Sequence, residues 1–161
     1  MAIEIERRFL VKGSEWKSTA KNAFHLCQGY LISNFEDWIV RVRIIEQKSA
    51  YLTLKAKAEG ISNHEFEYLI PLEDGNSLLQ LAPHKIKKTR YELNMNEGEW
   101  VIDCFEDNNF PLVIAEVELT SANQQIDRPF WCHTEITNNK NFSNAALALT
   151  PISDWPIEKR L

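Results

Sequence analysis

The strongest constraint on the fold of this chain is a charge pattern that first appears in IEIERRFLV (residues 3–11). Glu4, Glu6 and Arg8 occupy alternate positions, and apolar side chains lie between and after them. Successive side chains of a β-strand point to opposite faces, so these three charges share one face. The segment therefore predicts a strand with one charged face and one apolar face.

The same arrangement recurs along the chain. The charges at alternate positions are Arg41 and Arg43, Lys55 and Lys57, Glu65 and Glu67, Lys88 with Arg90 and Glu92, Asp103, and Glu116 and Glu118. Runs rich in β-branched and aromatic residues predict strands at 2–11, 26–32, 38–45, 50–58, 64–71, 86–94, 99–105 and 112–120. Seven of these eight strands carry the two-faced pattern.

Helical segments interrupt the strands. They are predicted at 14–22, at 74–82, over a short stretch from Ser121, and at 143–149. We expect an α+β fold in one domain over residues 1–161. Its antiparallel strands are enough to close a small barrel with the helices packed outside, and closure removes the exposed edges.

Composition limits the class of protein. The net charge of −5 argues against a general nucleic-acid binder. No apolar run reaches the roughly 18 residues of a membrane helix, and no secretory leader is recognisable. Cys27, Cys104 and Cys132 are odd in number and widely spaced, which predicts neither a zinc site nor a disulfide framework. A reducing cytoplasm is the expected compartment.

Charges on one face of a sheet are usually a solvated surface. Here, however, pairs of a single sign recur on strand after strand. If the barrel closes with its apolar face outward, these charges line the interior, where they must be paired or bind a ligand. Carboxylates hold Mg²⁺ or Mn²⁺, and arginine and lysine hold phosphate oxygens. The pattern therefore indicates a metal-bound polyanion as the ligand.

An ordered set of motifs resembles the CYTH domains, also called triphosphate tunnel metalloenzymes. IEIERRFLV is similar to their amino-terminal ExExK signature. It is followed, in the family's order, by QGYL (28–31), VRVR (40–43), LTLKAK (52–57), HEFE (64–67), KKTRYE (87–92), VIDCF (101–105), AEVEL (115–119) and NAALAL (144–149). The resemblance is greatest to short bacterial members that hydrolyse inorganic tripolyphosphate, and it implies an eight-stranded antiparallel β tunnel with helices outside.

The resemblance also implies roles for individual residues. It implies metal ligation by Glu4, Glu6 and Glu118, with Asp103 and Glu116 assisting or holding a second ion. It implies contacts to the triphosphate by Arg8, Arg41, Arg43, Lys55, Lys88 and Arg90. Glu6 and Lys55 are the expected catalytic residues, and Lys55 is expected to orient the attacking water. Tyr30 is either a residue of the tunnel mouth or a packed strand aromatic, and Glu65 and Glu67 are expected to form salt bridges in the interior.

The chain departs from the family pattern at three places. Arg8 stands in place of the signature lysine, Asn63 stands where relatives carry arginine, and NNKNFSN (138–144) replaces a more charged segment. These differences bear on substrate affinity and choice. A thiamine-triphosphatase and a class IV adenylate cyclase, in which Trp38 or Phe35 would stack on a base, therefore remain alternatives.

Two further alternatives are proteins without catalytic activity. One is a polyphosphate-binding module without turnover, and the other is a structural barrel filled with salt bridges. Buried ion pairs seldom stabilise a protein relative to an apolar core, which argues against the second. Trp131, Trp155 and the apolar tail are candidate contacts of a homodimer.

Overall fold

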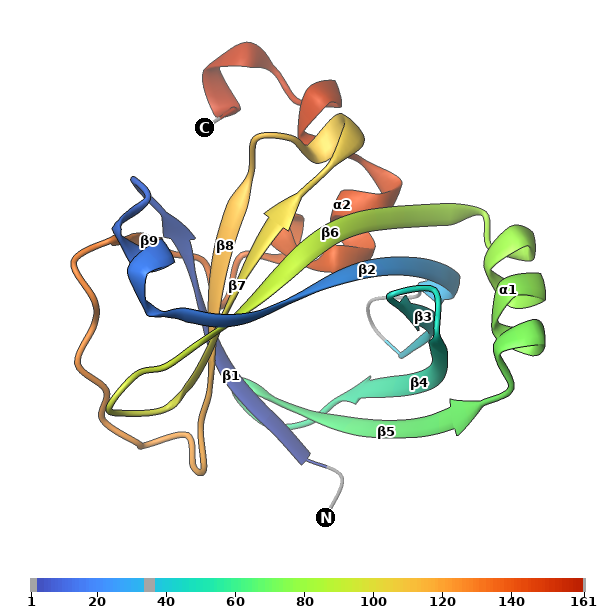
Figure 1. Ribbon diagram of the computed structural model, residues 1–161, viewed down its shortest axis with the longest axis horizontal. Coiled ribbons are helices and arrows are strands. Elements are labelled where there is room, and N and C mark those ends of the chain that lie inside the picture. Colours follow the sequence, from blue (N-terminus) through green and yellow to red (C-terminus); the bar gives the residue numbers. More distant parts are fainter. Residues whose placement is uncertain (1–2, 34–36, 161) are drawn as a thin grey trace.

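The computed structural model describes residues 3–33 and 37–160. In this part of the chain, nine strands form one sheet in the order β5-β4-β3-β2-β6-β7-β8-β1-β9 (Figure 1). The strands are β1 (Ile3–Val11), β2 (Ala20–Ser33), β3 (Trp38–Ile45), β4 (Ser49–Lys57), β5 (Ser62–Ile70), β6 (His84–Leu93), β7 (Glu99–Phe105), β8 (Val113–Glu118) and β9 (Cys132–Glu135).

The sheet closes on itself where β5 meets β1. Residues 62–64 of β5 pair antiparallel with residues 3–5 of β1, and residues 6–10 of β1 pair with β8. Strands β1 to β8 thus form the closed eight-stranded antiparallel barrel that the sequence predicts. The ninth strand, β9, pairs with the last residues of β1. It was not predicted, because its sequence CHTE is short and has no apolar alternation.

Residues 3–33 and 37–160 also contain two α-helices and five 3₁₀ helices, some between strands and the others after β9. They are α1 (Leu72–Leu81), α2 (Asn144–Leu149), η1 (Glu15–Thr19), η2 (Asp107–Asn109), η3 (Lys140–Phe142), η4 (Ile152–Asp154) and η5 (Ile157–Lys159). The predicted positions of α1 and α2 are confirmed to within two residues. No helix follows Ser121, where the chain makes a turn instead.

The helix predicted over 14–22 is wrong. A single short 3₁₀ helix ends at Thr19, and β2 begins at Ala20 rather than at residue 26. Residues 20–30 pair with β6 over nearly its whole length. This pairing supplies the backbone hydrogen bonds that a helix would have made locally, so tertiary contacts override the helical cap signal at Ser14.

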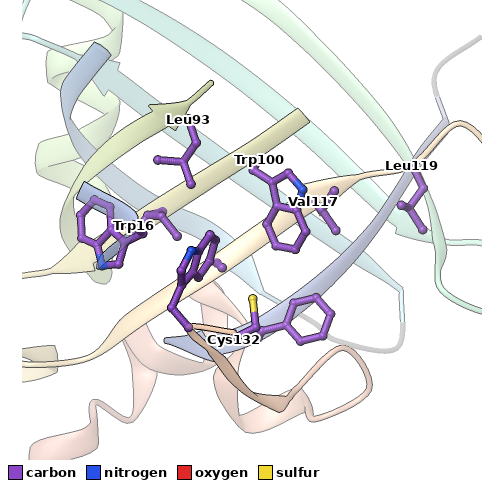
Figure 2. Packing of buried hydrophobic residues seen from close by; sticks show 10 residues of the cluster. Trp16, Leu93, Trp100, Val117, Leu119 and Cys132 are labelled. Atoms are coloured by element: carbon purple, nitrogen blue, oxygen red, sulfur yellow. The ribbon is translucent and has the colours of Figure 1, made fainter. Parts of the chain in front are cut away.

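The apolar face of β1, β7 and β8 is covered from outside. Phe9, Trp100 and Val117 pack there against Trp16 of η1 and against Trp131, next to β9 (Figure 2). The Trp100 and Trp131 rings meet edge to face, with centroids 5.6 Å apart. Such an aromatic layer contributes to stability through its large buried area. It also covers the outward, apolar face of these strands, so their charged face points into the barrel interior.

Helix α1 covers a second outer face, over β2, β3 and β4, where it packs on Val42, Ile44 and Ala50. Gly75 allows this contact, because a Cβ at that position would overlap with the side chain of Ala50. The prediction that helices pack outside the barrel is confirmed for α1. No helix in the described parts of the chain has the length and apolar character needed to cross a membrane.

Helix α2 has a different position from α1, because it closes one end of the barrel. Ala145 and Leu147 pack against Ile86, Phe105 and Ile114, a cluster that also contains Tyr30. Ile86 and Ile114 lie two residues from Lys88 and Glu116 on the inward face of their strands. The interior is thus apolar at the end that α2 plugs and charged above it.

Candidate active site in the barrel interior

Two adjoining cavities of about 470 and 500 Å³ occupy the charged part of the barrel. Their linings share Glu6, Arg41, Lys55 and Asn144. The first extends toward the connection between β6 and β7, and the second toward residues 137–145. Together they form a continuous charged cavity inside the barrel, which we call the tunnel. Its volume lies in the range typical of small-molecule sites.

An ion-pair network in which Lys88 and Asp103 are fully buried forms one wall of the tunnel. Nζ of Lys88 lies 2.7 Å from Oδ2 of Asp103, and the Arg90 guanidinium donates to both oxygens of the same carboxylate at 2.8 and 2.9 Å. Burial acts to raise the pKa of Asp103, but the positive charges of Arg90 and Lys88 hold this pKa well below its usual range. Burial lowers the pKa of Lys88 to about 7 despite the attraction of Asp103.

The opposite wall pairs bases with acids of neighbouring strands. Nζ of Lys55 lies 2.9 Å from Oε1 of Glu4 and 3.2 Å from Oε2 of Glu65. Arg41 donates to Thr53 at 3.1 Å and lies 3.5 Å from Oε2 of Glu67. The salt bridges expected for the two HEFE glutamates are therefore confirmed. Burial acts to lower the pKa of Lys55, but the nearby Glu4 and Glu6 carboxylates raise it overall.

Arg8 and Arg41 retain donors that the described parts of the protein do not satisfy, and Arg43 has no carboxylate partner there. Arg8 and Arg41 are each only 7% exposed. Nε and Nη2 of Arg8, and Nε of Arg41, are buried and have no hydrogen-bond partner there. Arg43 forms no ion pair with a described carboxylate, and burial together with Arg41 and Arg90 lowers its pKa to about 9. Buried and unsatisfied cations are costly, so these donors favour an anionic ligand.

Several carboxylates of the tunnel lie close to one another as well as to these bases. Burial, then Glu116 and Glu4, raise the pKa of Glu6 well above its ordinary value. Burial and then Glu99 raise the pKa of Glu118, which lies directly across from Glu6 in the β1–β8 register. Mutual repulsion of this kind is relieved by a cation.

The donor set fits Mg²⁺ or Mn²⁺, which prefer oxygen ligands. Among residues 3–33 and 37–160, however, no three acidic, histidine or cysteine side chains are already arranged around one point. Glu4 is engaged by Lys55. Metal ligation by Glu4 would therefore require its carboxylate to leave this ion pair. Asp103, with both oxygens bound to Lys88 and Arg90, is placed to hold these two bases.

The structure brings the predicted metal-binding and triphosphate-binding residues together. All eleven residues expected to bind metal or triphosphate belong to the tunnel lining or to the ion-pair network in its wall: Glu4, Glu6, Arg8, Arg41, Arg43, Lys55, Lys88, Arg90, Asp103, Glu116 and Glu118. Lys57 and Asn63 line only the second cavity.

The aromatic residues are placed differently. Tyr30 is 3% exposed and packs in the apolar cluster under α2, and it also lines the second cavity. Trp38 lies in an outer groove with Ile32 and Val40, away from the tunnel. It is therefore not placed to stack on a base in the tunnel. Phe35 lies outside the described residues.

Sequence reasoning missed three polar residues of the site. Gln28 is fully buried, accepts a hydrogen bond of 2.8 Å from Nε of Arg43 and donates one to Tyr30. Asn144 accepts a hydrogen bond of 3.0 Å from Lys88. Thr53 joins Arg41 to Glu67. The only sequence signal for Gln28 and Thr53 is their position in line with inward-facing charged residues of the sheet. This signal is weak because their own side chains are uncharged.

Comparisons with known proteins agree with this geometry. The family model described as "CYTH domain" matches residues 2–146. An inorganic triphosphatase of Acetivibrio thermocellus is 37% identical over 96% of this chain and 99% of its own length. An inorganic triphosphatase of Nitrosomonas europaea is 33% identical over 91% of this chain and 97% of its own length.

Solved structures show the same fold. The crystal structure of an inorganic triphosphatase superimposes with a TM-score of 0.66 at 30% identity, covering 91% of this chain and 97% of that chain. A Hippeastrum protein described as having a dominant triphosphatase activity shares the fold, with a TM-score of 0.56 at 15% identity and coverage of 75% and 80%. From the tunnel, the motifs and these matches together, the chain belongs to the CYTH domain family.

Proposed function

We propose that this protein hydrolyses inorganic tripolyphosphate within the tunnel, with Mg²⁺ or Mn²⁺ as the cofactor. The observation that carries the proposal is the coexistence of buried arginine donors without partners and of two carboxylates, Glu6 and Glu118, whose pKa is raised by burial and by neighbouring acids. A polyphosphate anion satisfies the first set, and a divalent cation satisfies the second. The two relatives named inorganic triphosphatase, at 37% and 33% identity, support the same substrate.

The residues of the tunnel have distinct roles in this proposal. Arg8, Arg41 and Arg43 bind phosphate oxygens and neutralise the chain of the substrate, because their guanidinium groups match phosphate geometry. Lys88 and Arg90 add positive charge from the wall, where Asp103 holds them in place. Glu4, Glu6, Glu116 and Glu118 would hold the metal ion, which when bound neutralises charge on the phosphoryl oxygens.

Bond cleavage requires no covalent enzyme intermediate. A water oxygen attacks the terminal phosphorus, the bond from that phosphorus to the bridging oxygen breaks, and orthophosphate and pyrophosphate leave. Lys55 lies at the junction of the two cavities, where its ammonium group can orient the attacking water. Catalysis then consists of positioning and charge stabilisation by groups that are held before the substrate arrives.

A substrate panel tests this proposal against its alternatives. Phosphate release from tripolyphosphate, thiamine triphosphate and ATP would be measured with each metal, together with the formation of cyclic AMP from ATP. We expect tripolyphosphate to be turned over with the highest kcat/KM, because charged and polar side chains dominate the lining of both cavities and suit an inorganic polyanion. Higher kcat/KM for thiamine triphosphate, or cyclic AMP as the main product, would overturn the assignment. Tight tripolyphosphate binding without turnover would instead identify a binding module.

A cytoplasmic location belongs to the same proposal. Cys27, Cys104 and Cys132 are all free thiols in the structure, and a reducing compartment keeps thiols in this state. Fractionation of cells that produce the protein would check this, since recovery outside the cytoplasm would contradict it.

A further inference from the structure

The ammonium group of Lys88 is enclosed by its neighbours. Nζ lies 2.7 Å from Oδ2 of Asp103, 3.0 Å from Oδ1 of Asn144 and 5.5 Å from the centre of the Phe105 ring. The residue is fully buried and lines neither of the two cavities of the tunnel. A ligand in the tunnel therefore does not reach Lys88 while these neighbours are in place.

Asn144 lies between Lys88 and the tunnel. It lines both cavities, at the junction that it shares with Glu6, Arg41 and Lys55. A lysine ammonium only donates hydrogen bonds, so the oxygen of the Asn144 amide must face Lys88. The NH₂ group of the same amide is turned to another side, and it donates to no residue in the described parts of the chain. Two N–H donors are thus available at the junction of the cavities.

The backbone that carries Asn144 is held on both sides of this residue. The carbonyl of Phe142 accepts a hydrogen bond of 2.8 Å from Nη1 of Arg8. The hydroxyl of Ser143 accepts one of 3.1 Å from the backbone N–H of Ala146 and so caps α2. The side chain of Asn144 therefore starts from a fixed position, as a residue that contacts a ligand requires.

The hydrogen bond from Lys88 also changes the chemistry of the Asn144 amide. A positive charge at the amide oxygen draws electron density from the nitrogen, and hydrogen bonds in a chain strengthen one another in this way. The NH₂ group thus becomes a better donor toward an anion. The charge of Lys88 reaches the tunnel through Asn144, although the ammonium group itself stays buried.

We propose that Asn144 binds a phosphate oxygen of the substrate through its NH₂ group, and that Lys88 is a positioning residue that orients and polarises this amide. The inference rests on the proposed function, because it takes a polyphosphate as the ligand. It assigns to Asn144 the direct contact that the sequence led us to expect of Lys88. An aspartate at position 144 would hold Lys88 equally well, but it would present an oxygen to the phosphate instead of a donor.

The experiment measures tripolyphosphate binding by isothermal titration calorimetry in EDTA, where no turnover occurs. The test variants are Asn144→Asp and Asn144→Ala. Asn141→Asp is the matched control, because it makes the same change in the same segment at an exposed residue that lines neither cavity of the tunnel. Urea unfolding of each variant shows whether the fold is kept.

Both Asn144 variants are expected to bind tripolyphosphate at least about tenfold more weakly than wild type, since each lacks the donor to a charged group. The loss should be larger for Asn144→Asp, which adds a negative charge beside the ligand. The same variant should be at least as stable as wild type, because its carboxylate still accepts from Lys88. Asn141→Asp should bind like wild type.

Two further readouts separate contact from support. The ¹⁵N NMR signal of the Asn144 NH₂ group, assigned by its absence from Asn144→Asp, should move when tripolyphosphate is added, and should move less in Lys88→Met. In a double-mutant cycle, Lys88→Met should cost less affinity in the Asn144→Ala background than in wild type. Equal losses in the two backgrounds would show that Lys88 acts without Asn144 and would overturn its positioning role.

Each alternative predicts a different result. If Asn144 only held Lys88 in place, Asn144→Asp would bind tripolyphosphate like wild type. If Asn144 only lay near the ligand, Asn144→Ala would bind like wild type. Either result, or an NH₂ signal that tripolyphosphate does not move, would overturn the inference while wild-type binding and hydrolysis leave the proposed function intact. A wild type that bound no tripolyphosphate with or without metal would overturn both. If Asn144→Ala lost its fold, the isosteric Asn144→Asp and the NMR signal would decide.

Discussion

Nζ of Lys55 lies 2.9 Å from Oε1 of Glu4, so a base proposed to serve the phosphate and an acid proposed to bind the metal neutralise each other. Binding of a cation by Glu4 would release Lys55 toward the substrate. Binding of the anion by Lys55 would release Glu4 toward the metal. We therefore expect metal and tripolyphosphate to bind cooperatively, each removing a competitor of the other.

The Glu4→Gln variant tests this coupling. It removes the charge that holds Lys55, so tripolyphosphate should bind about fivefold to tenfold more tightly in EDTA, a gain of roughly 1 kcal/mol. Hydrolysis with Mg²⁺ should fall at the same time. Isothermal titration calorimetry measures the first effect and phosphate release the second. Glu59→Gln, in an exposed turn, should change neither. Unchanged or weaker binding of Glu4→Gln in EDTA would show that the pair does not restrain Lys55.

Metal binding should depend on pH through Glu6. Its raised pKa means that part of the Glu6 population carries a proton above the pH at which an ordinary glutamate is ionised. Because a metal binds only the ionised carboxylate, affinity for Mn²⁺ should rise with pH through this pKa, and binding should release a proton. Calorimetry in buffers of different ionisation enthalpy measures the protons released. Release that is absent or equal in wild type and Glu6→Gln would contradict the raised pKa of Glu6.

The Lys88–Asp103–Arg90 network should be important for stability. Asp103→Asn leaves two buried cations without their carboxylate, and loss of one partner from a buried ion pair costs about 3–5 kcal/mol. Urea unfolding would measure the change in the free energy of unfolding. The control Asp107→Asn, at an exposed position, should change it by less than about 0.5 kcal/mol. A loss from Asp103→Asn no larger than that of the control would show that other groups or water compensate the cations.

Gln28 should act on the substrate through Arg43. Its side-chain oxygen is the one hydrogen-bond acceptor seen for Nε of Arg43 in the described structure. Removing a hydrogen bond to a charged group costs about 1.5–3 kcal/mol. Gln28→Ala should therefore lower kcat/KM by roughly ten- to a hundredfold, with most of the loss in KM if Arg43 contacts the substrate in its ground state. Gln125→Ala is an exposed control. Equal kcat/KM for the two variants would exclude a positioning role.

Much of the fold could be predicted because charged and apolar residues alternate along the strands of the barrel. On β1, β3, β4 and β8, inward charges and outward apolar residues follow one another, and the predicted strand bounds differ from the observed ones by at most two residues. A closed barrel is the arrangement that removes so many charged faces from the exterior while covering the apolar ones.

The failures have equally specific causes. The start of β2 was missed because Ser14 and Trp16 suggest a helix locally, and only distant β6 supplies the competing pairing. Strand β9 depends on a contact between Phe9 and Glu135 that no local pattern reveals. The position of α2 at the barrel end, instead of its wall, depends on inward apolar residues such as Ile114 that sequence alternation alone assigns to the charged face.

Within the site, the sequence identified the charged residues but not their partners. A metal role for Asp103 stays a prediction, and what the sequence did not reveal is that its carboxylate pairs with Lys88 and Arg90. Which acid neutralises which base depends on register and rotamer across three strands, and alternation carries no such information. The uncharged Gln28 and Asn144 were missed for the same reason.

The central claim is that the carboxylates of the opening strand hold a metal needed for tripolyphosphate hydrolysis. The most direct measurement is phosphate release from tripolyphosphate with Mg²⁺, with Mn²⁺ and in EDTA, for wild type and Glu6→Gln side by side. The account predicts rapid release by wild type with metal only, and a loss of at least about a hundredfold in Glu6→Gln, which lacks a ligand charge. No release by wild type with either metal, or equal release by both proteins, would contradict it.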